Sequence, residues 1–187
     1  MSAPPSTAAA PALLLIGLRG SGKSTLGRLL AAALTSSFID LDDRTRALTG
    51  HASVSAAFNA IGEAAFRAAE TRALQETLAQ AGPGTVIALG GGTPTAPGAR
   101  AVLEEARAAG RVRIALLEAP PAVLGARLSV TPGDRPLLMG SNFAEEAALL
   151  AQRRMPLYRA LADATIDTSR PTEVALADLL AFARRGA

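Results

Sequence analysis

"GLRGSGKST", residues 17–25, fits the pattern G-x-x-x-x-G-K-[S/T] and contains Lys23, the only lysine of the chain. It follows the apolar run "ALLLIG" (12–17), which predicts a buried strand, and it leads into a helical pattern over residues 23–34. This strand–loop–helix context is the one in which the pattern binds phosphate groups, and a chance glycine turn would not be expected to have it. The stretch therefore predicts an α/β fold with a phosphate-binding loop.

Each residue type in this loop has a physical reason. Gly17, Gly20 and Gly22 let the backbone fold tightly, so that its N–H groups point at phosphate oxygens. The helix that follows brings the positive end of its dipole to the same place. Lys23 supplies a compact charge on a flexible stem, which a planar guanidinium does not replace like for like. The Ser24 hydroxyl is a suitable ligand for Mg²⁺, so the loop predicts a site for phosphates and Mg²⁺ together.

The rest of the chain alternates apolar runs with helical patterns, as α/β domains do. Strands are predicted at 12–17, 37–40, 111–119 and 164–168, and residues 85–92 are predicted to be a strand that runs into a glycine loop. Helices are predicted at 23–34, 43–80 with breaks near Gly50 and Gly62, 97–109, 120–128, 142–158 and from Pro171 onwards, and Asn142 with Glu145 has capping-box spacing. We expect one α/β domain over residues 12–187, with a central parallel five-stranded sheet between two layers of helices, after a flexible tail over residues 1–11.

The composition excludes several kinds of protein. The 187 residues suit one domain, and its core must be aliphatic because aromatic residues make up only 3%. Cysteine is absent and His51 is the only histidine, which excludes disulfides, thiolate zinc sites and multi-histidine metal sites. No apolar run approaches the roughly 18 residues of a membrane span. With a net charge of +3 and scattered arginines, we expect no nucleic-acid partner. Since the start of the sequence also lacks the basic region of a signal peptide, we expect no membrane partner and a cytoplasmic location.

Two carboxylates follow the second predicted strand in "FIDLDD" (38–43). Asp40 and Asp42 alternate along the chain, so one can face a metal ion and the other a hydroxyl group of a substrate. Carboxylates at the carboxyl end of a parallel strand, beside a phosphate-binding loop, suit both tasks. The alternative is structural, with Asp42 or Asp43 capping the helix that follows.

Two patterns in the middle of the chain also suit ligand binding. Arg67 and Glu70 in "GEAAFRAAE" (62–70) are three residues apart on a predicted helix and can pair. Such a pair is usually a solvated salt bridge. The triple glycine "GGG" (90–92) after a strand either lets a ligand approach the backbone closely or is a plain loop.

Arginines recur in the last third of the chain. Arg135 lies in the Pro- and Gly-rich segment 129–141, where it can close over phosphates as part of a lid. Arg153, Arg154 and Arg159 belong to the predicted helix that contains "RRMPLYR". Without further information these three form a basic exposed helix face.

Taken together, the patterns resemble the shikimate kinase family over residues 14–170, with the elements in the same order. The matching segments are "GLRGSGKSTLGRLLA" for the phosphate-binding loop and first helix, "FIDLDD" for the D-x-D segment, "GEAAFRAAE" for G-E-x-x-F-R-x-x-E, "ALGGGT" for the triple-glycine loop, "DRPLL" for the R-P-L-L lid and "RRMPLYR" for R-x-P-x-Y. Each match alone is weak, whereas six in order are strong.

The resemblance implies a three-layer P-loop kinase fold with a mobile lid. It also implies ATP-dependent phosphorylation of the 3-hydroxyl of shikimate, a step of aromatic amino acid biosynthesis that yields shikimate 3-phosphate and ADP. ATP and Mg²⁺ are then the cofactors, shikimate is the small-molecule partner, and a monomer is expected. The residues implied for ATP are Gly20, Ser21, Gly22, Lys23, Ser24, Thr25, Arg135 and Arg170, and those implied for Mg²⁺ are Ser24 and Asp40.

For the acceptor, the resemblance implies that Arg67 and Arg154 clamp the shikimate carboxylate, a planar target that suits guanidinium groups. Glu70 would orient Arg67, and Asp42 would hold the substrate hydroxyls and assist removal of the proton. The residues implied for shikimate are Asp42, Arg67, Gly90, Gly91, Gly92 and Arg154, and the implied catalytic residues are Lys23, Asp42 and Arg135.

The remaining roles are also carried over from the family. Gly91 would offer its backbone to shikimate. Phe58 and Phe66 would flank the ring of the acceptor or simply pack in the core. Arg135 would cover the phosphates in the transition state, and Arg170 in "DTSRP" would border the adenine.

Two features depart from the family, and three other functions stay open. Arg19 stands at a loop position where the family more often has a small or apolar residue, and "SVSAAF" (53–58) lacks an acidic residue that is often present there. The alternatives are a kinase for another acceptor such as gluconate, a kinase-like domain that regulates transcription, and an adenylate-kinase-like enzyme. Two arginines with a triple glycine favour a compact carboxylate, and residues 1–11 are too few for a DNA-binding segment.

Overall fold

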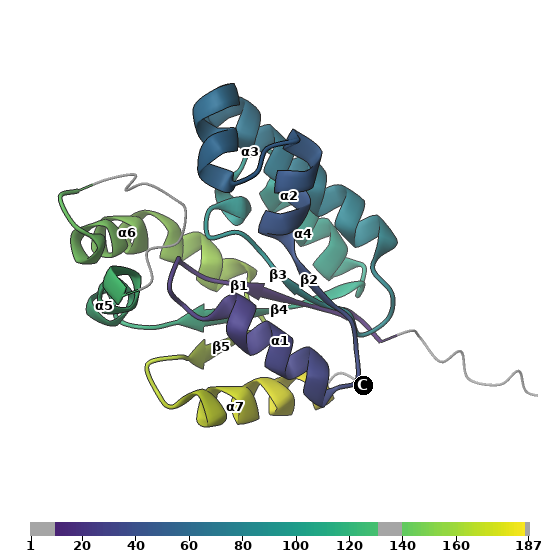
Figure 1. The fold of residues 1–187 in the computed structure, drawn as a ribbon. Helices are drawn as coiled ribbons and strands as arrows, with labels where there is room; N and C mark the ends of the chain where they lie inside the picture. The colour runs from purple at the N-terminus through teal and green to yellow at the C-terminus, as the bar shows by residue number, and fades with distance from the viewer. Residues whose placement is uncertain (1–9, 131–139, 186–187) are drawn as a thin grey trace, which may run out of the picture.

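A five-stranded parallel sheet forms the centre of the computed structural model, which describes residues 10–130 and 140–185 (Figure 1). The strands are β1 (Ala12–Ile16), β2 (Phe38–Asp40), β3 (Val86–Ala88), β4 (Val112–Glu118) and β5 (Ala164–Asp167). Their order in the sheet is β2-β3-β1-β4-β5, and all four pairings are parallel. The predicted sheet is confirmed, and all its strands end at one edge, where the loops that follow them meet.

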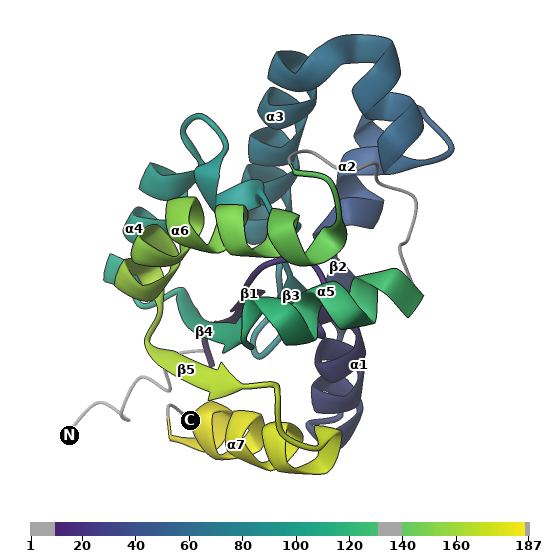
Figure 2. The same ribbon diagram turned by 90° about the vertical axis from the view of Figure 1, so that its left-hand side faces the viewer.

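Helices cover both faces of this sheet. They are α1 (Lys23–Ala33), α2 (Leu41–Thr49), α3 (Val54–Gln80), α4 (Ala99–Ala108), α5 (Pro121–Val130), α6 (Phe143–Leu161) and α7 (Thr172–Arg184), with a short 3₁₀ turn at Thr93–Thr95. Figure 2 views the molecule from the side on which α5 and α6 lie. None of the helices in the described ranges is both long and apolar enough to cross a lipid bilayer.

The alternation of side chains along β1 divides the core in two. Leu14 and Ile16 face one cluster, which also contains buried side chains of α3, α4 and α6. Leu13 and Leu15 face a second cluster, which includes buried side chains of α1 and α7. Because both faces of the strand are covered, the run "ALLLI" is apolar throughout rather than alternating. This arrangement is the three-layer architecture that the sequence predicts.

Most helix boundaries agree with the predictions, and those of α2, α5 and α6 differ from them at one end. Gly50 and Gly62, with φ of 70° and 77°, interrupt the long helical pattern as expected. However, α2 begins at Leu41, and its cap is Asp40, whose carboxylate accepts the Asp42 N–H at 3.1 Å. The structural alternative, in which Asp42 or Asp43 would cap this helix, is therefore wrong. The end of α5 also differs from the prediction, because this helix continues to Val130, two residues into the segment expected to be a loop.

The predicted cap of α6 is present with a shifted partner. The Asn142 side chain accepts the N–H groups of Ala144 and Glu145. The Glu145 carboxylate accepts a hydrogen bond from the N–H of Ser141, whereas a capping box would have it accept from the N–H of Asn142. Hydrogen bonding to Ser141 lowers the pKa of Glu145 below its ordinary value. The helix then continues through Pro156 to Leu161, three residues beyond the expected end.

A close crossing of α5 and α6 gives a stability prediction. A Cβ atom at Gly125 would lie 2.5 Å from the Cα of Ala144, which is backbone and cannot rotate away. We expect Gly125→Ala to lower the free energy of unfolding by about 1–3 kcal/mol because α5 must move off α6. Urea denaturation measures the change. In the control Gly82→Ala, where the nearest heavy atom is 3.8 Å away, the change should stay below about 0.5 kcal/mol. Equal effects of the two substitutions would contradict the packing argument.

Candidate active site

The phosphate-binding loop, residues 17–25, leaves the carboxyl end of β1 and runs into α1. Gly20 and Gly22 have φ of 75° and 86°, in the left-handed region that favours glycine. The Nζ of Lys23 donates to the carbonyl oxygens of Gly17 and Leu18, both at 2.9 Å. Because these bonds hold a buried lysine inside the turn of the loop, the ammonium group lies where phosphates would enter. The predicted context of the motif is confirmed.

Ser24 and Asp40 lie together beside this loop. The Ser24 hydroxyl donates to Oδ2 of Asp40 at 2.7 Å, and Oδ1 of the same carboxylate caps α2. The cap fixes the carboxylate, and the serine oxygen keeps its lone pairs available for a cation. In the described ranges no group of three or more histidine, cysteine or acidic side chains is arranged to hold a metal ion. Two hard oxygen donors fit Mg²⁺ in a site where phosphates and water complete the ligand set.

A cavity of about 740 Å³ opens next to the loop, between α1, α5 and the start of α7. Arg127 of α5 lines it and donates to the carbonyl oxygens of Gly20 and Thr168, so it connects the loop to the segment after β5. Arg170 also lines the cavity and pairs with Asp178 at 3.3 Å. The remaining lining residues from the predicted nucleotide set are Gly20, Ser21, Gly22 and Thr25. Arg127 was not among the predicted site residues, because a single arginine on a predicted helix has no distinguishing pattern.

The glycine loop, residues 90–92, is the point at which the other predicted groups meet. A Cβ atom at Gly90 would lie 2.5 Å from Oδ1 of Asp42, and one at Gly91 would lie 3.2 Å from the backbone nitrogen of Arg19. A Cβ atom at Gly92 would collide with the guanidinium group of Arg67. Each glycine therefore makes room for a different neighbour. The loop brings the carboxylate, the phosphate-binding loop and the arginine to one place, so it is more than a plain turn.

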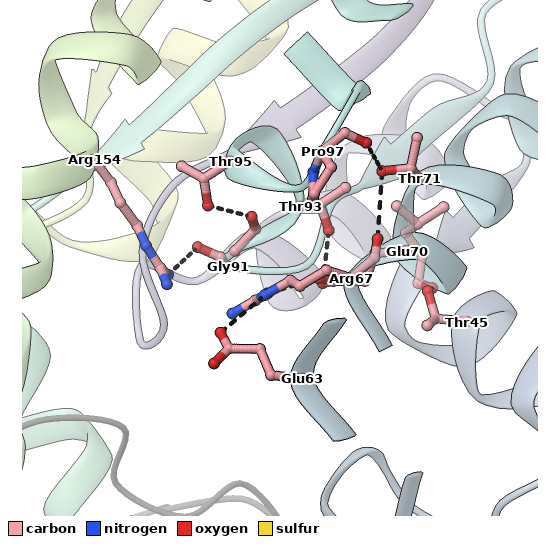
Figure 3. A network of polar contacts seen from close by, with 12 residues as sticks. Thr45, Glu63, Arg67, Glu70, Thr71, Gly91, Thr93, Thr95, Pro97 and Arg154 are labelled. Atoms are coloured by element: carbon pink, nitrogen blue, oxygen red, sulfur yellow. Dashed lines mark hydrogen bonds and ion pairs between the residues drawn. The ribbon is translucent and has the colours of Figure 1, made fainter. Parts of the chain in front are cut away.

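Arg67 and Glu70 form a buried pair on α3, which the sequence left as a possible solvated salt bridge (Figure 3). The guanidinium donates to Oε2 of Glu70 at 2.6 Å, and Glu70 is fully buried. The second oxygen of Glu70 accepts a hydrogen bond from Thr93 at 3.0 Å, and exposed Glu63 lies 3.6 Å from Arg67. Glu70 thus anchors Arg67 to the segment that follows the glycine loop, with the rest of the guanidinium directed at residues 90–92.

Arg154 and Tyr158, one turn apart on α6, both donate to the carbonyl oxygen of Gly91, at 3.0 and 2.8 Å. Figure 3 shows the bond from Arg154. Burial lowers the pKa of Arg154 and raises the pKa of Tyr158 to about 12. The two bonds fix the glycine loop against α6 and bring Arg154 to the same loop as Arg67. Tyr158 was not among the predicted site residues, since it contacts the site through a residue 67 positions away.

The raised pKa of Tyr158 gives a prediction for alkaline solution. The unfolded chain loses this proton near pH 10 and the folded chain near pH 12, so the contribution to stability is complete below pH 10 and is lost as the pH rises to 12. We expect a loss of about 2–3 kcal/mol over this window from Tyr158. Urea unfolding at a series of pH values measures it, and Tyr158→Phe should remove that part of the loss.

The tyrosine itself can be observed in the same experiment. Since the chain has one tyrosine and no tryptophan, the tyrosinate absorbance reports Tyr158 alone. A folded protein that forms tyrosinate at the ordinary pKa of 10 would contradict the burial argument.

Several predicted residues lie elsewhere. Phe58 and Phe66 pack against each other, with ring centroids 5.7 Å apart, in a small apolar cluster of α3. Arg153 is exposed, and Arg159 pairs with Glu118, so for these two the basic exposed face is the right interpretation. Arg135 and most of the predicted lid lie outside the described residues.

The fold and these contacts define a class of enzyme. A phosphate-binding loop at the end of the central strand, a serine–aspartate pair whose oxygens suit Mg²⁺ and a second loop flanked by two arginines are what a P-loop kinase for a small acid requires. The family model described as "Shikimate kinase" matches residues 19–183. The chain therefore belongs to the shikimate kinase family.

Individual proteins support the same family. The chain is 40% identical over 161 residues, 86% of each sequence, to a shikimate kinase of Mycobacterium tuberculosis. It matches the solved structure of Acinetobacter baumannii shikimate kinase in complex with shikimate with a TM-score of 0.81 and 31% identity, over 94% of each chain. A gluconokinase from Sinorhizobium meliloti matches with a TM-score of 0.62 and 21% identity, over 94% of this chain and 92% of its own, which shows a shared fold alone.

Proposed function

We propose that the groups gathered at the carboxyl edge of the sheet carry out the reaction of the family, the ATP-dependent phosphorylation of the 3-hydroxyl of shikimate. The observation that carries this proposal is the convergence of two arginines from different helices, Arg67 and Arg154, on the glycine loop beside the phosphate-binding loop. Two guanidinium groups next to one loop suit a compact carboxylate. Shikimate is such an acid, and the reaction yields shikimate 3-phosphate and ADP.

The donor half of the site binds the nucleotide. Backbone N–H groups of residues 20–25 and Lys23 would hold the phosphates of ATP. The adenosine part would enter the cavity that Arg127 and Arg170 line. Mg²⁺, held by Ser24 and Asp40 with phosphate oxygens and water, would neutralise charge on the phosphates. In this arrangement the cap of α2 keeps Asp40 in place before the nucleotide arrives.

The acceptor half positions the hydroxyl group. Asp42, which lies over Gly90, would accept hydrogen bonds from the shikimate hydroxyls and assist removal of the proton. Arg67 and Arg154 would pair with the carboxylate, and Glu70 keeps Arg67 oriented. The glycine loop leaves room for the ring against its backbone. Phe58 precedes the break at Gly62 and packs against Phe66, the neighbour of Arg67 in the chain, and we place Phe58 at the edge of the ring.

The remaining parts of the proposal concern residues and properties outside these contacts. Arg135, from the segment between α5 and α6, would cover the transferring phosphoryl group as part of a lid over 129–141. A monomer in the cytoplasm is the simplest state for a single domain with a self-contained site. Protease cleavage of residues 129–141 should slow in the presence of both substrates, and unchanged cleavage rates would count against the lid. Size-exclusion chromatography tests the oligomeric state.

The decisive test is a coupled assay of ADP release with Mg·ATP and a panel of acceptors: shikimate, quinate, gluconate and none. Turnover with shikimate alone is the expected result. Turnover with quinate or gluconate instead would support a small-molecule kinase and would reject shikimate as its acceptor. A protein that binds ATP yet turns over no acceptor would favour the alternative of a kinase-like regulatory domain.

A further inference from the structure

Arg19, the loop residue that departs from the family, is held by α6. Its guanidinium lies 3.8 Å from the carboxylate of Glu146 and 6.0 Å from the ring centroid of Phe143. The exposed fractions of the two charged side chains are 13% for Arg19 and 1% for Glu146. A carboxylate this deeply buried requires a compensating charge, so the pair is more than a surface ion pair.

Glu146 stands in register with the acceptor arginine. Glu146, Leu150, Arg154 and Tyr158 follow one another at intervals of four, which places them along one stripe of α6. Glu146 contacts the phosphate-binding loop through Arg19. Arg154 and Tyr158, further along the same stripe, donate hydrogen bonds to the carbonyl oxygen of Gly91.

The same stripe is joined to both loops of the site. The backbone of Arg19 packs directly on Gly91, where a Cβ atom would lie 3.2 Å from the Arg19 nitrogen. The phosphate-binding loop, the glycine loop and α6 therefore form a closed triangle of contacts. Movement of α6 relative to the phosphate-binding loop would break one of its sides.

We propose that Arg19 is a positioning residue that acts through Glu146 to keep α6, and with it Arg154, at a fixed place relative to the phosphate-binding loop. In this role the Arg19–Glu146 pair determines where the carboxylate of shikimate binds relative to the phosphates of ATP. Arg19 itself contacts neither the carboxylate nor the phosphates. This inference rests on the proposed function, because it assigns Arg154 to the acceptor. Loss of the pair would displace the arginine by a small amount, and small displacements at such sites are costly.

A double-mutant cycle tests the proposal. Arg19→Met and Glu146→Gln each remove the ion pair while keeping much of the side-chain volume. We expect each to raise the KM for shikimate and its dissociation constant in calorimetry about tenfold. The KM for ATP and kcat should change by less than about twofold, since the donor half is intact. The double variant should be no worse than either single one. Arg19→Lys, which retains the charge, should restore part of the affinity.

The exposed pair Arg100–Glu104 on α4 supplies the matched control. Arg100→Met and Glu104→Gln should leave both substrate constants unchanged. Effects of Arg19→Met and Glu146→Gln that multiply to about a hundredfold would overturn the coupling. The proposal would also be overturned if Arg19→Met greatly lowered kcat while Glu146→Gln left all kinetic constants unchanged. That result would mean that Arg19 acts on the phosphoryl group itself. Wild-type turnover with unaffected variants rejects only the role of the pair. An inactive wild type that still binds shikimate in calorimetry rejects the proposed reaction, and its dissociation constants still test the pair. A wild type that does not bind shikimate rejects the acceptor and this inference with it.

Discussion

Lys23→Met is expected to lower kcat by about a thousandfold while the protein stays folded, the largest effect that we predict. The Nζ of Lys23 is held in the loop by two carbonyl oxygens, and we propose that it meets the outer phosphates of ATP. A methionine has a similar length and no charge, so the loop keeps its shape and loses its cation. Lys23→Arg should also fail, because a planar guanidinium cannot take the place of the ammonium inside the turn.

Chemistry at this position can be checked without mutation. Lys23 is the only lysine, so an amine-reactive reagent can label only this side chain and the amino terminus. Mg·ATP should slow labelling of Lys23 in mass spectra and should leave the terminus unaffected. Circular dichroism checks whether the Lys23→Met variant is folded, as we expect. A variant that keeps more than about a tenth of the wild-type kcat would contradict the proposed role of Lys23.

Arg154→Met is expected to raise the KM for shikimate about a hundredfold, with the KM for ATP within about twofold of wild type. The guanidinium is mostly buried, so a carboxylate bound beside it would lose a charge-assisted partner and keep its desolvation cost. Tyr158 still holds the carbonyl of Gly91 in this variant, so the glycine loop should stay in place. Steady-state kinetics with each substrate varied in turn separate the two constants.

The adjacent residue supplies the control for this prediction. Arg153 lies on the exposed side of α6, and Arg153→Met removes the same charge from the same helix. It should leave the KM for shikimate within about twofold of wild type. If both variants lost shikimate affinity equally, the effect would come from the general charge of α6 and not from a carboxylate site.

The parts of the site that the sequence predicts are those made by neighbours in the chain. The phosphate-binding loop depends on residues within one turn, and its glycines and lysine have the predicted geometry. The sheet follows from five apolar runs, and Gly50 and Gly62 interrupt the helical pattern where their φ angles require glycine. In each case the physical cause acts over a few residues, so it can be recognised in the sequence.

The parts that were missed or left open depend on contacts between distant residues. Whether Arg67 and Glu70 are solvated or buried is decided by Thr93 and the glycine loop, more than twenty positions away. The bonds of Arg127 to Gly20 and Thr168 span 107 and 41 positions. The choice of Asp40 over Asp42 as the cap of α2 follows from where β2 ends, which the sequence locates only to within a few residues.

The order of the strands constrains how acceptor preference can evolve on this scaffold. β1 and β3 are direct neighbours, paired from Leu13–Val86 to Leu15–Ala88, and the phosphate-binding loop and the glycine loop leave their adjacent ends. The distance between the two loops is thus tied to the spacing of hydrogen-bonded strands, about 4.8 Å, which point mutations do not change. The groups proposed to select the acid come instead from α3 and α6, outside the sheet. Substitutions in two helices can therefore change which acid is bound, while the distance between the phosphate-binding loop and the glycine loop is inherited unchanged.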